Sequence, residues 1–461
     1  QALGYQGGYT SQGQYGIALG YQGGYTSQGQ YGIALGYQSG QTSQGTQSIA
    51  MGTNAAGNTQ STFSIAIGAN TAYQTQGANS VAMGTNAGNW NQGTQSVAIG
   101  QFAGQTSQSQ YAVAIGSGAA TNNQGFGSVA IGNQSGNASQ GQLSVAVGVN
   151  AGASSQSAQS VAIGYAAGTS NQGSYGVAIG NNAGYGNQGQ NAIAIGNSTQ
   201  SSGSGSGAFS IGIGYYAGNY NQGVSSISLG YQAGNLSQNA YSIAIGANTA
   251  YQGQQANSVA MGTNAGNLNQ GVSAVAIGTN AGANTQGQYS IAIGSSAGYV
   301  SQPAQSIMIN ANTSALNGVN SGLYINPIRT DNVNANNQLY YNTTTKEVTQ
   351  TSLIYIPISP LYATGGTLTL TNLQSQIIQM NSSLPAILTM PTGTSIEAGY
   401  PGIGSQMGFD FYIINTGGTV TLGTNTGVTS QVGSNVVATG TSAHFRLQRT
   451  GANTFTTFRL S

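Results

Sequence analysis

Residues 95–110 read QSVAIGQFAGQTSQSQ, and units of this form follow one another through most of the chain. Eighteen consecutive units run from Tyr15 to Ala304, and all but one are 16 residues long. A fixed short period is the signature of a solenoid, in which each repeat forms one coil that stacks on the next. We number the positions of a unit so that Gln95 is position 1 and Gly100 is position 6. The pattern predicts an all-β fold, a parallel β-roll or β-solenoid with 16-residue coils.

The first half of each unit is typical of a β-strand. Position 3 is always Val or Ile, position 5 is Ile, Leu, Met or Val, and position 4 is Ala in all but two units. Alternate strand residues point to opposite faces, so positions 3 and 5 share one face and positions 2, 4 and 6 share the other. We expect the larger side chains to fill the core of the roll, including Val97, Ile99, Val129, Ile131, Val161 and Ile163. We expect the small-residue face to pack against other copies around a common axis, with Ala18, Ala98, Ala130, Ala162 and Ala276 at that axis.

The second half of the unit carries a nearly invariant glutamine. Position 14 is Gln in seventeen of the eighteen units. Coils about 4.8 Å apart would bring these amides within reach of one another, so we expect a hydrogen-bonded ladder. The ladder would include Gln28, Gln44, Gln92, Gln140, Gln188 and Gln270. The exception is the 18-residue unit that begins at Asn191, where the Ser/Gly-rich residues 201–207 predict a flexible bulge.

Composition excludes several functions for the repeat region. Residues 1–328 contain no Lys, Arg, Asp, Glu or His. Acid–base catalysis, binding of hard metal ions and neutralisation of phosphate need such groups, so we predict no enzyme activity, no cofactor and no metal site. The net charge of +1 gives no electrostatic basis for binding nucleic acid. No run of about 18 apolar residues occurs, so we predict no membrane insertion by a helix.

The repeat pattern ends near residue 310, and the rest of the chain divides in two. Residues 1–310 are the predicted solenoid rod, and residues 311–352 are a predicted connector rich in Asn and Thr. Residues 353–461 contain about eight short alternating apolar runs separated by Gly-containing turns, which predict a β-sandwich resembling a jelly roll. The expected strands are 353–356, 367–370, 377–378, 387–390, 409–414, 419–422, 445–449 and 455–460.

The C-terminal domain holds the candidate contact residues. We predict that Arg446, Arg449 and Arg459 either bind a surface ligand or form ion pairs within or between subunits. Asp410 and His444 have no motif around them that indicates a catalytic triad. Asn-X-Ser/Thr sequons mark candidate glycosylation sites at Asn133, Asn137, Asn197, Asn235, Asn312, Asn342 and Asn381.

The repeated pentapeptide carries a family resemblance. Residues 96–100 and 128–132 both read Ser-Val-Ala-Ile-Gly, which resembles the head repeats of trimeric autotransporter adhesins. This resemblance covers residues 1–310 and implies a left-handed parallel β-roll wound as a homotrimer. The period is longer than is usual in that family, and no heptad stalk follows. Residues 322–348, which include the run LYYNTTTKEV, are similar to segments of fibre proteins from large algal viruses and phages.

These observations predict a non-enzymatic structural fibre, extracellular or on a virion surface, whose C-terminal domain caps, attaches or joins trimers. One alternative is an adhesin whose C-terminal domain binds a host surface glycan or receptor. Another is an ice-binding or matrix-forming solenoid, although position 7 lacks the regular Thr array that ice binding needs. Because the chain begins in mid-strand, we expect either further repeats before Gln1 or a head-to-tail filament that covers this edge.

Overall fold

The computed structural model describes residues 1–201, 206–328, 337–352, 364–374, 376–400 and 407–461. They form two compact units, Gln1–Ile328 and Arg329–Ser461. The predicted strand 353–356 and most of the predicted bulge, residues 202–205, lie outside the described residues. The all-β prediction is confirmed, since the only helices among the described residues are two short ones in the second unit.

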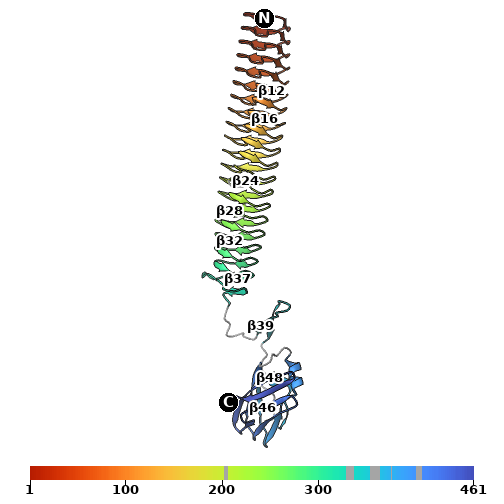
Figure 1. The fold of residues 1–461 in the computed structure, drawn as a ribbon, viewed down its shortest axis with the longest axis vertical. Coiled ribbons are helices and arrows are strands. Elements are labelled where there is room, and N and C mark those ends of the chain that lie inside the picture. Colours follow the sequence, from red (N-terminus) through yellow and green to blue (C-terminus); the bar gives the residue numbers. More distant parts are fainter. Residues whose placement is uncertain (202–205, 329–336, 353–363, 375, 401–406) are drawn as a thin grey trace. The chain divides into compact units, whose positions relative to one another are not determined.

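The first unit is a stack of coils that Figure 1 shows as a regular column from the N-terminus onward. One wall is a 21-stranded parallel sheet in which each strand pairs with the equivalent strand of the next coil. Val97, for example, pairs with Val113, one coil further along the chain. The strands of this wall are β1 (Ala2–Leu3), β3 (Ile17–Leu19), β5 (Ile33–Leu35), β7 (Ile49–Met51), β9 (Ile65–Ile67), β11 (Val81–Met83), β13 (Val97–Ile99), β15 (Val113–Ile115), β17 (Val129–Ile131), β19 (Val145–Val147), β21 (Val161–Ile163), β23 (Val177–Ile179), β24 (Ile193–Ile195), β25 (Ile211–Ile213), β27 (Ile227–Leu229), β29 (Ile243–Ile245), β31 (Val259–Met261), β33 (Val275–Ile277), β35 (Ile291–Ile293), β37 (Ile307–Asn310) and β38 (Leu323–Asn326).

The last strand of this wall lies beyond the predicted end of the rod. β38 pairs in parallel with β37 over four residues, so residues that we assigned to the connector continue the stack. The repeat sequence is lost there, but Leu323 and Ile325 keep the alternation that the strand needs. The rod therefore extends past residue 310.

The opposite wall is built from positions 12–14 of each unit. It consists of an 11-stranded and a six-stranded parallel sheet, separated around the 18-residue unit. The first sheet contains β2 (Ser11–Gln12), β4 (Ser27–Gln28), β6 (Ser43–Gln44), β8 (Thr59–Gln60), β10 (Thr75–Gln76), β12 (Trp90–Gln92), β14 (Thr106–Gln108), β16 (Asn122–Gln124), β18 (Ala138–Gln140), β20 (Ser154–Gln156) and β22 (Ser170–Gln172). The second contains β26 (Tyr220–Gln222), β28 (Leu236–Gln238), β30 (Gln252–Gln254), β32 (Leu268–Gln270), β34 (Asn284–Gln286) and β36 (Val300–Gln302).

The two faces of the first wall are the reverse of our prediction. The alanines assigned to a trimer axis, Ala18, Ala98, Ala130, Ala162 and Ala276, are fully buried inside the single roll. The residues assigned to the roll core, Val97, Ile99, Val129, Ile131, Val161 and Ile163, point outward and are half-buried or exposed. The alternation was correct, but the assignment of its inner face was wrong.

The narrowness of the roll explains this reversal. A Cβ built on Gly88, at position 10, would lie 3.3 Å from the Ala82 Cβ and 2.9 Å from the Gln92 side chain. The space between the walls is therefore already filled by alanine, glycine and one glutamine side chain per coil. In the repeated coils, a Val or Ile at position 4 would overpack this interior; the larger Met308 is buried at this position only in β37, beyond the last repeat.

Glycine at position 6 sets the distance between coils. Gly116 has a φ of +129°, and a Cβ on it would lie 2.4 Å from the carbonyl oxygen of Gly132 in the next coil. Any larger residue would combine an unfavourable backbone conformation with a clash against the neighbouring main chain. This explains why all eighteen units carry Gly there.

The second unit contains a β-sandwich, as predicted. Its five-stranded sheet has the order β42 (Ile377–Met380), β44 (Gly408–Asn415), β48 (Thr441–Gly451), β49 (Thr454–Arg459) and β46 (Val428–Val432). Its four-stranded sheet has the order β41 (Gly366–Thr367), β43 (Ala386–Thr389), β45 (Val420–Gly423) and β47 (Val436–Val437). Buried side chains from both sheets, such as Leu388 and Phe411, form one hydrophobic core.

The sandwich differs in detail from an antiparallel jelly roll. Its sheets are mixed, because β42 pairs with β44 in parallel and β43 pairs in parallel with both β41 and β45. Two short helices, α1 (Leu370–Gln374) and α2 (Gly393–Gly399), connect strands. A two-stranded antiparallel hairpin, β39 (Asn337–Tyr341) with β40 (Val348–Ser352), precedes the sandwich in the chain.

Candidate functional site

The outward side chains at positions 3 and 5 form an apolar stripe along the rod. We call this the outer stripe. It comprises the position 3 and 5 residues of the 21-stranded wall, from β3 to β37. Ile131 and Ile163 are each 38% exposed, and Leu229 is 41% exposed. Because neighbouring strands pair in register, each of these side chains lies next to its equivalent in the next coil. The result is a row of apolar side chains that continues from coil to coil along the rod, and extended apolar surfaces of this kind mark interaction sites.

No ionisable group interrupts the outer stripe, since the first Lys, Arg, Asp, Glu or His of the sequence is Arg329. Strand edges and apolar faces in monomeric proteins are usually protected by charged residues. This face has none, and its half-buried or exposed Val, Ile, Leu and Met side chains favour contact with another apolar surface. Sequence reasoning missed the stripe because it placed these side chains inside the roll.

The glutamines of position 14 lie inside the roll and not on its surface. Gln92 is 2% exposed, and its Nε2 donates to the Val81 carbonyl on the opposite wall at 2.8 Å. Gln28, Gln44 and Gln188 make the equivalent bond to Ile17, Ile33 and Val177. Each glutamine therefore ties the two walls of one coil together.

The predicted ladder between glutamines is present in part. Gln140 Nε2 donates to Gln156 Oε1 at 3.2 Å, and Gln270 Nε2 donates to Gln286 Oε1 at 3.1 Å. For Gln28, Gln44, Gln92 and Gln188, only bonds to main-chain carbonyls are shown among the described residues. The wall-to-wall bond is therefore the common feature, and the coil-to-coil bond is additional.

At the 18-residue unit the interior stays filled because a larger side chain at position 10 is matched by a smaller residue at position 4 of the next unit. Gln200 of the 18-residue unit stands at position 10, where most units have Gly, and is 2% exposed. Gln200 Nε2 donates to Gln222 Oε1 at 2.5 Å, so Gln200 makes the coil-to-coil bond that a position 14 glutamine makes in other units. In the following unit position 4 is Gly212, where a Cβ would lie 2.9 Å from the Gln200 Cγ. The smaller residue at position 4 makes room for the larger one at position 10.

The charged residues of the sandwich pair with one another. Asp410 on β44 accepts from Arg446 Nε at 2.6 Å and from Arg446 Nη2 at 3.0 Å, and it contacts His444 Nε2 at 2.9 Å. Hydrogen bonds from Arg446, followed by the smaller contribution of His444, lower the pKa of Asp410 below its ordinary value. His444 also stacks on Tyr412, with ring centroids 4.3 Å apart.

The other two candidate contact residues of the C-terminal domain also bond to groups within that domain. Arg449 Nη2 donates to Glu397 Oε1 at 2.7 Å, and this bond lowers the Glu397 pKa. Arg459 Nη1 donates to the main-chain carbonyl of Val436 at 2.6 Å. The structure thus places Arg446 and Arg449 in intradomain ion pairs, the second of the two roles that we considered, whereas Arg459 is shown bonding to main-chain carbonyls of its own domain. The side chain of Arg446 remains 50% exposed.

These pairs predict that acid destabilises the sandwich but not the rod. A carboxyl whose pKa is lower in the folded state than in the unfolded state stabilises the folded state at pH values above its unfolded-state pKa, which is about 4. This contribution to stability is lost as the pH falls through the pKa of the folded state. Calorimetry of the full chain should therefore show the sandwich transition move to lower temperature below about pH 4. Fluorescence of Trp90, the single Trp and a residue of the rod, should report an unchanged rod transition. A matched Asp410→Asn, Glu397→Gln variant should lose the pH dependence, whereas a rod that melts first in acid would contradict the prediction.

The candidate glycosylation sites differ in accessibility. Asn133, Asn197, Asn312, Asn342 and Asn381 are exposed. Asn137 is half-buried, and its Nδ2 donates to the Gly118 carbonyl and to Thr121 Oγ1, both at 3.0 Å. Asn235 is only 5% exposed, so the folded rod leaves no room for a glycan there, and that candidate was wrong. Glycosylation at the exposed sites stays a prediction.

The described residues contain neither a metal-binding cluster nor a membrane-spanning helix. No group of three or more His, Cys, Asp or Glu side chains in that part of the chain could hold a metal ion. Among the same residues, no helix has the length and apolar character needed to cross a membrane.

Comparison with known proteins supports the resemblance seen in the pentapeptides. The family model described as YadA head domain repeat (2 copies) matches residues 27–55, 43–71, 74–87, 139–167 and 270–297. All five segments lie in the rod, so the predicted likeness to adhesin head repeats is confirmed for them. No match was found among curated proteins or solved structures.

Proposed function

We propose that this protein is a structural, non-catalytic surface fibre whose rods associate as homotrimers through the outer stripe. The observation that carries the proposal is the uninterrupted apolar face along the rod, within residues 1–328, which contain no Lys, Arg, Asp, Glu or His. Burial of apolar area stabilises association by about 25 cal/mol per Å². Position 5 alone contributes one exposed or half-buried Ile, Leu, Met or Val per coil, so the favourable contribution grows with rod length.

The choice of a trimer rests on the YadA head repeats. The matched segments belong to a repeat type that resembles the heads of trimeric adhesins, and the stripe offers one apolar face per chain. Three such faces around one axis would cover all three stripes and leave a closed assembly. In this arrangement the small-residue face is not at the axis, because it already fills the interior of each roll.

The surface location is the second part of the proposal. We assign the fibre to an extracellular or virion surface, from which an adhesin-like rod would project. The likeness of residues 322–348 to viral fibre segments supports the virion surface, and the head repeats support a cell surface. The sandwich would then attach or cap the fibre.

The mass of the native full chain in solution tests the proposal. Sedimentation equilibrium should give three times the chain mass of 46.1 kDa across a wide range of salt concentrations. Salt should have little effect because the contact is apolar and uncharged. A monomer with an intact β-sheet circular dichroism signal would contradict the proposal, and a stable dimer would overturn the trimeric arrangement.

A further inference from the structure

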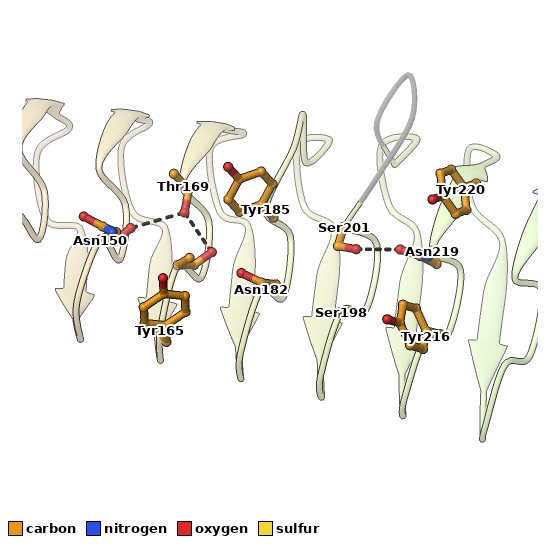
Figure 2. A pocket seen from close by; sticks show the side chains of 11 residues that line it. Asn150, Tyr165, Thr169, Asn182, Tyr185, Ser198, Ser201, Tyr216, Asn219 and Tyr220 are labelled. Carbon is orange, nitrogen blue, oxygen red and sulfur yellow. Dashed lines mark hydrogen bonds between the residues drawn. The ribbon is translucent and has the colours of Figure 1, made fainter.

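A groove lined by tyrosine side chains runs along the rod beside the 18-residue unit. Its volume is about 510 Å³, which is within the range of small-molecule sites. Figure 2 shows Tyr165 and Tyr216 in one row with Asn182 and Ser198 between them, and Tyr185 and Tyr220 on the other side. Tyr165 and Tyr216 are three coils apart, about 14 Å at the usual strand spacing.

The polar groups of the groove are amides and hydroxyls. Asn150, Thr169, Asn182, Ser198, Ser201 and Asn219 line it together with the four tyrosines. None of these side chains carries a charge at neutral pH. An amide can both donate and accept hydrogen bonds, as can a hydroxyl, so these groups match a ligand that is itself rich in hydroxyls. The absence of charge in the lining disfavours an ionic ligand.

The groove exists because a surface ladder is interrupted there. At position 8 most units carry Asn or Gln, which can bond from coil to coil, as Asn54 does to Asn70 at 2.9 Å. The residues before and after Asn182 at this position are Ala166 and Ser198, which are too short to continue the ladder. Within residues 1–201 and 206–328, the structure shows no side-chain hydrogen bond for Asn182. Its amide therefore lines the groove without a protein partner.

The walls of the groove are held in place by contacts behind them. Thr169 Oγ1 donates to the Ala166 carbonyl at 2.8 Å, and Ser201 Oγ donates to Asn219 Oδ1 at 2.5 Å. Tyr216 packs edge-to-face on Tyr215 with ring centroids 4.4 Å apart. Tyr215 in turn stacks on Tyr231 at 5.4 Å. Such support keeps a site preorganised and lowers the entropy lost on binding.

We propose that this groove binds a neutral oligosaccharide. Pyranose rings present apolar C–H faces that pack on tyrosine rings, and hydroxyls around their edges that pair with amides. A chain of a few sugar units lying along the rod axis would contact Tyr165 at one end and Tyr216 at the other. A proline-rich peptide could also pack on tyrosines, but it offers few partners for the Asn, Ser and Thr side chains between them.

This inference deepens the proposed function, since it gives the adhesin-like rod a ligand class, and it places recognition on the rod, not on the C-terminal sandwich. Isothermal titration of the full chain with linear oligosaccharides of glucose, galactose, mannose and N-acetylglucosamine tests it. We expect saturable binding of at least one of these, unchanged by salt. Tyr165→Ala and Tyr185→Ala, which remove rings that are 55% and 46% exposed, should each weaken it about tenfold.

Controls separate the site from the fold and from the trimer. Tyr185→Phe keeps the ring and should retain most of the affinity, and Tyr289→Ala, which removes a 56% exposed ring outside the groove, should leave binding unchanged. Sedimentation of the same samples reports the oligomeric state, so a trimer that fails to bind rejects this inference alone. Binding that survives both Tyr165→Ala and Tyr185→Ala, no binding to any panel member, or binding of a Pro-Pro-Gly repeat peptide alone would overturn it.

Discussion

Replacing Ile131 and Ile163 together with glutamate is expected to convert the proposed trimer into folded monomers. Both side chains belong to the outer stripe and point away from the interior of the roll, each 38% exposed in the single chain. In a monomer the new carboxylates would stay in water, and the fold should tolerate them. In a trimer the same carboxylates would be buried beside their equivalents from two other chains. An unpaired buried charge costs on the order of several kcal/mol, so the assembly should be lost.

The control places the same charge on the opposite wall. Asn122 on β16 and Ser154 on β20 are exposed, and Asn122→Glu with Ser154→Glu adds two carboxylates at similar heights on the rod. That variant should remain trimeric. Sedimentation gives the mass, and circular dichroism shows that both variants keep their β-structure. Lowering the pH until the carboxyls are protonated should restore trimers of the first variant. An unchanged mass at neutral pH would show that the outer stripe is not the contact.

The coil and its register could be predicted because they depend on local, repeated features. Val or Ile at position 3, Ala at position 4 and Gly at position 6 recur in phase, and parallel pairing of equal positions follows from stacking equal units. The structure shows this register from Ala2–Leu3 onward. In the sandwich, the predicted strands at 377–378, 387–390, 409–414, 419–422, 445–449 and 455–460 correspond to observed strands. Their apolar alternation was a sufficient signal.

The inner face could not be assigned by the usual association of large apolar side chains with a core. That association fails when two walls are too close to hold such side chains. The sequence did contain a signal for the inner face. Position 10 is usually Gly and position 4 is usually Ala, but where position 10 is the larger Gln200, position 4 of the next unit is the smaller Gly212. Compensating changes of residue size at two positions indicate that both side chains pack in the same interior. By contrast, Ile, Leu, Met and Val replace one another freely at position 5, because that face lies outside the roll.

Other features depend on contacts that no single repeat encodes. The tyrosine groove is formed by positions 7, 8, 11 and 12 of several successive coils, so it has no periodic signature. The helix α1 begins at Leu370, inside a segment that we predicted to be the strand 367–370, and at five residues it is too short to show a helical period. The arginine contacts of the sandwich required the strand register of β44 and β48, which places Asp410 opposite Arg446.

Replacing Gln124 with glutamate should make the stability of the rod depend on pH, although the native rod contains no group that titrates in acid. Gln124 is 1% exposed, and its Nε2 donates to the Val113 carbonyl at 2.7 Å. The same nitrogen lies 3.3 Å from the acceptors Ser128 O and Gln140 Oε1. A carboxylate oxygen in its place would face three oxygens without a proton to share. Burial and this repulsion would raise the folded pKa of the new carboxyl well above its unfolded value of about 4.3.

The sign of the effect follows from that raised pKa. The folded state binds the proton more tightly than the unfolded state, so the variant is least affected below about pH 4 and loses stability as the pH rises. At pH 7 the loss should reach about 3–4 kcal/mol, from roughly 1.4 kcal/mol for each pH unit above the unfolded value. Thermal unfolding followed by Trp90 fluorescence measures it, because Trp90 lies in β12 of the rod. Gln142→Glu makes the same chemical change at an exposed position and should show no pH dependence. If Gln124→Glu melts at the same temperature in acid and at neutral pH, then the carboxyl reaches water and the interior of the roll is not closed.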